Sequence, residues 1–147
     1  CLSSCKPGTV TAVVKTWCNA WPTSYRKHET VRDCLFGCSG SNNDKLQHYI
    51  GDCKCWSLLA DCKKEPLFAS VAQKLCLSNV AEETLLDIHI LLETYQSVSA
   101  RPSLCAPEAI VNIFHDTYRR SRMYFKAPVK KSRAANGVGS RSHNWTI

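Results

Sequence analysis

Ten cysteines in a chain of 147 residues restrict the fold of this protein more than any other feature. Nine of them lie between Cys1 and Cys76, and the tenth is Cys105. An even number of cysteines at this density is typical of extracellular domains in which disulfide bonds supplement a small core. We therefore expect disulfide bonds, of undetermined pairing, among Cys1, Cys5, Cys18, Cys34, Cys38, Cys53, Cys55, Cys62, Cys76 and Cys105.

Zinc binding is the alternative use of these cysteines. Cys34 and Cys38 have a spacing found in structural zinc sites, and further cysteines follow at Cys53, Cys55 and Cys62. Cys53 and Cys55 are separated by a single residue, which does not match that spacing. The density of cysteines favours disulfides, so we expect no metal and no other cofactor, with every cysteine oxidised and a fold that survives a chelator.

Apolar residues recur with helical rather than strand spacing along most of the chain. This spacing predicts helices over 9–17, 45–50, 66–75 and 79–98, and a further helix that begins at 107. Another segment with a helical pattern opens at 22–24 and ends near 34, and turn-forming residues over 39–44 predict a loop. In the first helix the expected apolar face is Val10, Val13, Val14 and Trp17. The fold class is therefore all-α: a small disulfide-braced helical bundle with a flexible basic C-terminal tail.

Charge divides the chain differently from the cysteines. Residues 1–100 carry ten Lys or Arg and ten Asp or Glu, whereas residues 101–147 carry nine basic and two acidic residues. Such asymmetry is typical of a neutral folded body with a basic arm. We expect one domain over 1–126, with a cysteine-rich part (1–78) and a helical part (79–126), followed by a basic flexible tail (127–147).

The basic run over 119–133 is a candidate binding site for a polyanion. Clustered cations bind polyanions because they release condensed counterions. If the helix continues beyond Tyr118, some of these cations share one face. A solvated tail without a partner is the open alternative. The candidate residues are Arg119, Arg120, Arg122, Lys126, Lys130, Lys131 and Arg133, and Asn144 lies in a glycosylation sequon.

Catalytic motifs are sparse. His115, Asp116 and Tyr118 are similar to the His-Asp-x-x-Tyr motif of secreted phospholipases A2, but the spacing is one residue shorter. The glycine-rich calcium loop of that family has no counterpart upstream. We therefore expect the protein not to be an enzyme, and a phospholipase A2-like activity stays an alternative.

The cysteines over 18–76 resemble those of a known module. They run Cys-x15-Cys-x3-Cys-x14-Cys-x-Cys-x6-Cys-x13-Cys, and the sequence GDCKCWSLLADCKKEPLFASVAQKLC at 51–76 is the most specific part. This pattern is similar to the cysteine-rich helical domain of the receptor alpha chains for glial-cell-line-derived neurotrophic factor, shared with growth-arrest-specific co-receptors. The resemblance implies an all-helical, disulfide-braced extracellular module that binds a protein ligand without catalysis.

The functional prediction from the sequence is an extracellular receptor or co-receptor module, secreted or on the outer face of the cell. Its expected partners are a protein ligand or receptor and heparan-type glycans, with no nucleic acid. No membrane insertion is expected, because no apolar run approaches the roughly 18 residues that span a bilayer. A secreted hormone-like or toxin-like effector is the alternative from another class.

Overall fold

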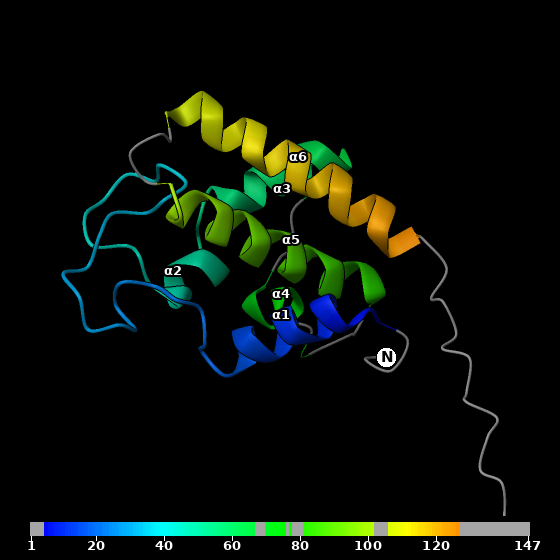
Figure 1. Ribbon diagram of the computed structural model, residues 1–147, viewed down its shortest axis with the longest axis horizontal. Coiled ribbons are helices and arrows are strands. Elements are labelled where there is room, and N and C mark those ends of the chain that lie inside the picture. Colours follow the sequence, from blue (N-terminus) through cyan, green and yellow to red (C-terminus); the bar gives the residue numbers. More distant parts are fainter. Residues whose placement is uncertain (1–4, 67–69, 76, 78–80, 102–105, 127–147) are drawn as a thin grey trace, which may run out of the picture.

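The computed structural model describes residues 5–66, 70–75, 77, 81–101 and 106–126, and in that part of the chain the regular structure is entirely helical (Figure 1). This confirms the all-α class. The helices are α1 (Pro7–Trp17), α2 (Leu46–Ile50), α3 (Cys55–Lys63), α4 (Val71–Lys74), α5 (Glu82–Ser99) and α6 (Pro107–Lys126). Among the described residues, no helix is long and apolar enough to cross a membrane.

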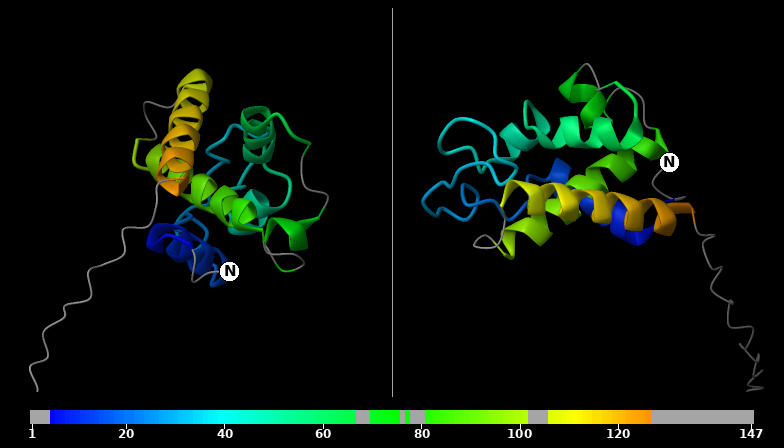
Figure 2. Two further views of the ribbon diagram at one scale, coloured as in Figure 1. Left: turned by 90° about the vertical axis from the view of Figure 1, so that its right-hand side faces the viewer. Right: turned by 90° about the horizontal axis from the view of Figure 1, so that it is seen from above.

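Helix α5 forms the centre of the molecule. It packs against α1 on one side and α6 on another, while α3 packs against α6 (Figure 2). Apolar residues occur almost all round α5, and burial of its side chains against several neighbours is what such a pattern predicts. Its buried apolar residues are Leu85, Leu86, Ile88, Ile90, Leu91, Leu92, Tyr95 and Val98.

Helix α1 forms where it was expected, but a different face is buried. The residues against the core are Thr9, Ala12, Val13 and Thr16, whereas Val14 and Trp17 are each 44% exposed. Thr16 tolerates burial because its hydroxyl donates to the carbonyl of Ala12 and accepts from the indole of Trp21. The expected apolar face was therefore wrong: the buried face is shifted around the helix by about one residue.

The segment between α1 and α2 contains no helix, so the helical pattern proposed for 22–34 was wrong. Instead the chain makes a series of turns, with positive φ at Asn19, His28 and Asn42. The expected loop over 39–44 is confirmed. Trp21 in this segment is fully buried, and its ring is stacked on Tyr49 at 5.8 Å between ring centroids.

Asp44 holds this irregular segment to the helices. Its carboxylate accepts hydrogen bonds from the Ser24 N–H (2.8 Å), Tyr49 hydroxyl (2.9 Å), Tyr95 hydroxyl (3.1 Å) and Arg32 guanidinium (3.2 Å). Burial acts to raise the pKa of Asp44, but the hydrogen bonds from Ser24, Tyr49 and Tyr95 outweigh it and lower the pKa. The segment thus depends on one ionised, buried carboxylate.

The helix ends differ from the expected ones in detail. Helix α5 begins at Glu82 rather than at residue 79, and Asn79 lies outside the described residues. Helix α4 begins after Ser70, which forms a capping box with Gln73. Helix α6 extends to Lys126, so the helix that begins at Pro107 does continue beyond Tyr118. The predicted sites Lys130, Lys131, Arg133 and Asn144, and the cysteines Cys1, Cys76 and Cys105, lie outside the described residues.

A buried ion pair joins α3 to α5 and makes the stability depend on pH. Burial raises the pKa of Asp87 to about 6, although Lys63 Nζ lies 3.0 Å from its carboxylate. The folded state therefore binds this proton more tightly than the unfolded chain. The stability that Asp87 contributes is fully present below its ordinary pKa of about 4 and is lost as the pH rises through about 6.

We accordingly expect wild type to lose free energy of unfolding relative to Asp87→Asn between about pH 5 and pH 7. Urea denaturation at both pH values measures this difference. Asp61→Asn, which replaces an exposed acid on α3, is the control. Between the two pH values its free energy of unfolding should change by nearly the same amount as that of wild type. A constant offset between wild type and Asp87→Asn would contradict the prediction.

Candidate metal centre

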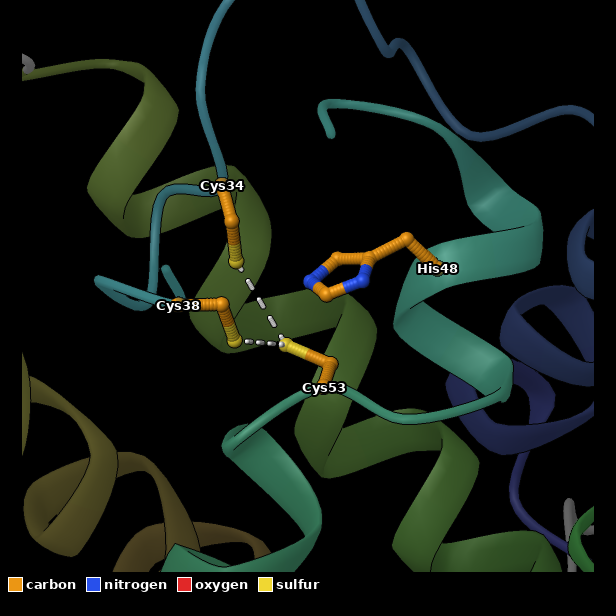
Figure 3. Close-up of side chains that lie close together, drawn as sticks. All are labelled: Cys34, Cys38, His48 and Cys53. Carbon is orange, nitrogen blue, oxygen red and sulfur yellow. Dashed lines mark hydrogen bonds between the residues drawn. The ribbon is translucent and has the colours of Figure 1, made fainter. Parts of the chain in front are cut away.

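Four potential metal ligands converge beside α2. Cys34 and Cys38 come from the turns that precede α2, His48 from α2 itself, and Cys53 from the connection to α3 (Figure 3). One ligand atom from each residue lies within 4.8 Å of the ligand atoms of the other three.

The distances between the sulfur atoms match a metal centre rather than a disulfide. Cys34 Sγ lies 3.5 Å from Cys53 Sγ, and Cys38 Sγ lies 3.7 Å from Cys53 Sγ. Zinc–sulfur bonds of about 2.3 Å in a regular tetrahedron place two sulfurs about 3.8 Å apart. A disulfide requires about 2.05 Å. The three sulfurs are therefore spaced to surround an ion of this size.

His48 supplies the fourth corner. Figure 3 shows its imidazole pointing from α2 toward the three sulfur atoms. Its Nε2 is buried and has no hydrogen-bond partner, and a polar atom in this situation is costly unless something binds it. Burial lowers the pKa of His48, although the charge of Asp52 opposes the shift. The imidazole is thus neutral, the form that binds a metal.

Backbone geometry brings the first two cysteines together. Gly37 has a φ of +71°, which glycine adopts without steric cost, and it turns the chain so that Cys38 faces Cys34. The N–H of Phe36 donates to Cys34 Sγ at 3.4 Å, and the N–H of Lys54 donates to Cys38 Sγ at 3.1 Å. Such donors stabilise the negative charge of thiolate ligands and fix their orientation.

Without a metal the cluster favours neutral thiols. The hydrogen bond with Cys53, together with burial, raises the pKa of Cys34 far above its ordinary value. Burial also raises the pKa of Cys38, although the Lys54 N–H opposes this shift. A divalent cation would displace these protons when it binds, so affinity for the metal must weaken in acid.

The ligand set differs from the one considered from the sequence. Cys55 is buried, and its sulfur contacts the carbonyl of Tyr49 at 3.7 Å; neither Cys55 nor Cys62 belongs to the cluster. Sequence reasoning missed His48. The available signal was His48-x4-Cys53 following Cys34-x3-Cys38, a regular order of two ligand pairs.

The expectation that every cysteine is bridged was wrong for a large part of the set. Among the described residues, none of these thiols lies at bonding distance from another cysteine sulfur. The unbridged cysteines are Cys18, Cys34, Cys38, Cys53, Cys55 and Cys62.

The other predicted sites lie on α6. Arg119 and Arg120 are exposed, and Arg119 makes only a long contact with Asp116 (3.8 Å). Arg122 is instead bound to Glu83 of α5 at 3.0 Å, which ties it to the fold. His115 is exposed beside them on the helix surface.

Protein-family models, curated proteins and solved structures contain no match to this chain. The similarity to receptor alpha chains therefore stays a prediction. What the geometry defines is a class of site: three cysteines and one histidine in a compact arrangement of the kind that binds zinc.

Proposed function

We propose that this chain is a non-catalytic nucleic-acid-binding module whose helical fold is held together by one zinc ion at Cys34, Cys38, His48 and Cys53. The observation that carries the zinc centre is the convergence of these four ligand atoms within 4.8 Å. Four protein ligands occupy every corner of a tetrahedron, which is the arrangement of structural rather than catalytic zinc sites. Three thiolates and one imidazole favour zinc over the hard cations magnesium and calcium.

The surface of α6 offers the contacts for a polyanion. Arg119 and Arg120 are followed, one turn later, by the exposed side chains of Met123 and Tyr124. A hollow of about 640 Å³ lies beside this surface, lined by Arg119, Arg120, Met123 and Asp116 of α6 and by Arg101 at the end of α5, which adds a further cation. Cations interleaved with an exposed aromatic ring suit single-stranded nucleic acid, because cations contact phosphates and rings stack on bases.

The state of the cysteines supports nucleic acid over a sulfated glycan. Our sequence-based preference for heparan-type glycans and for an extracellular location depended on a set of disulfides. Unbridged thiols arranged as metal ligands are typical of reducing compartments instead. Nucleic acid is the polyanion that such a compartment holds in quantity, and clustered arginines bind it by releasing its counterions.

Replacing Arg119 and Arg120 together by Gln should weaken binding to a single-stranded oligonucleotide. The loss of two phosphate contacts should reduce the slope of log affinity against log salt by about 1.4. Fluorescence anisotropy of a labelled oligonucleotide over a series of salt concentrations measures both quantities. Arg26→Gln with Lys27→Gln is the matched control, because it removes the same charge from an exposed part of the segment before α2.

Equal affinities and slopes for the two double variants would contradict the role of α6. A parallel titration with heparin separates the two polyanions. Binding to heparin without binding to the oligonucleotide would contradict the nucleic-acid proposal and favour the sulfated-glycan alternative. The receptor-module function stays a prediction, and binding to a folded protein ligand with no polyanion affinity would favour it.

A further inference from the structure

We propose that Cys38 is an oxidation site at which a hydroperoxide forms a Cys38–Cys53 disulfide and thereby releases the metal. This inference rests on the proposed zinc centre and adds its regulation. The cluster is asymmetric in its access to solvent: Cys34 and Cys53 are only 7% and 3% exposed, whereas Cys38 is half-buried. A small oxidant therefore reaches the sulfur of Cys38 first.

Lys54 contacts both Cys38 and the residue before it. The N–H of Lys54 donates to Cys38 Sγ at 3.1 Å, and the ammonium of Lys54 donates to the carbonyl of Gly37 at 2.9 Å. The sulfur of Cys38 thus accepts a hydrogen bond from the backbone, and the side chain of Lys54 holds the carbonyl of the residue before it. Zinc binding would hold Cys38 as a thiolate, and thiolates within reach of solvent are the ones that hydroperoxides oxidise.

Cys53 is placed to complete the reaction. Its sulfur lies 3.7 Å from Cys38 Sγ, so the two atoms must approach by about 1.7 Å to reach the length of a disulfide. Cys38 sits in a turn between exposed residues, Gly37 and Ser39, and outside any helix. Such a turn can shift without breaking a ladder of backbone hydrogen bonds.

The reaction proceeds in two steps. The Cys38 thiolate attacks hydrogen peroxide, the O–O bond breaks, and the products are Cys38–SOH and hydroxide. The Cys53 thiolate then attacks the sulfur of Cys38–SOH, the S–O bond breaks, and the disulfide and a second hydroxide form. The two sulfurs supply the two electrons that reduce the peroxide. Only Cys34 and His48 then remain as ligands, and the zinc ion dissociates.

The test uses the full chain loaded with zinc in a Cys18→Ser background, because Cys18 is an exposed thiol that would consume oxidant. Hydrogen peroxide is added stepwise, and a chromogenic chelator reports the zinc that is released. We expect one zinc per peroxide consumed, recovery of zinc binding after a dithiol reductant and fresh zinc, and a Cys38–Cys53 bridge in a peptide map without reduction. All four proposed ligands are present in this background, so the map does not depend on replacing any of them.

Cys62→Ser is the matched control and should release zinc at the unchanged rate. A map showing Cys34 bridged to Cys53, or zinc release with no disulfide, would overturn the assignment of Cys38. Retention of zinc at excess peroxide would overturn the inference while leaving the zinc centre intact. A chain that contains no zinc before peroxide is added would contradict the proposed function itself, and the inference with it.

Discussion

Removal of zinc by a strong chelator is expected to unfold most of the helical structure described above. Binding of structural zinc contributes about 10–16 kcal/mol in small zinc-dependent domains. This is comparable to the total stability of an ordinary domain, about 5–15 kcal/mol. Circular dichroism before and after chelation, and again after zinc is restored, measures the effect. The expected loss of helix reverses our prediction from the sequence that the fold survives a chelator.

Variants separate the metal from other effects of the chelator. Cys53→Ser removes the ligand whose sulfur lies 3.5 Å from Cys34 Sγ and 3.7 Å from Cys38 Sγ, so it should abolish stoichiometric zinc. Cys62→Ser, on α3 and outside the cluster, should retain one zinc per chain by elemental analysis. An unchanged unfolding transition in the presence of chelator would contradict the structural role of zinc.

Asp44→Ala is expected to cost about 3–4 kcal/mol of stability. The change leaves the Ser24 N–H and the hydroxyls of Tyr49 and Tyr95 without their buried acceptor. Each unsatisfied buried donor costs about 1–3 kcal/mol, and partial rearrangement reduces the sum. Urea denaturation in the presence of zinc measures the loss of free energy of unfolding.

The same substitution should also weaken zinc binding, although Asp44 is not a ligand. The Tyr49 hydroxyl donates to Asp44 and accepts from the N–H of Leu35, the residue that follows Cys34. Loss of Asp44 therefore loosens the turn that presents Cys34. Competition with a zinc chelator of known affinity measures this effect.

Asp33→Ala is the matched control. Its carboxylate lies in the same segment and accepts one exposed hydrogen bond, from the N–H of Asn42. We expect a change within about 0.5 kcal/mol, as for most surface substitutions. Equal losses of stability in the two variants would show that Asp44 does not hold the segment.

The sequence by itself determined the elements with strong periodic patterns. The apolar stripe around Leu85 to Val98 predicted α5 and its deep burial, and Pro107 marked the first residue of α6. Turn-forming residues identified the loop over 39–44. These features are local, because helix periodicity and turn chemistry act within a few residues of chain. The excess of positive charge after residue 100 is likewise a property of composition alone.

Only the tertiary structure decided which face of α1 is buried. Both threonine and valine side chains of α1 could face the core. Which of them does so depends on whether a partner forms a hydrogen bond with the threonine hydroxyl. Trp21, which donates to Thr16, lies beyond the end of the helix and outside its periodic pattern. No local pattern contains this information.

The use of the cysteines was also decided in three dimensions. Spacing marked Cys34 and Cys38 as a pair, but thiols suit disulfides and metals equally well until their neighbours are known. His48 and Cys53 join them because Asp44 and Tyr49 hold an irregular segment against α2. That segment has no periodicity from which its path could be predicted, so the ligand set emerges only from its packing on the helical core.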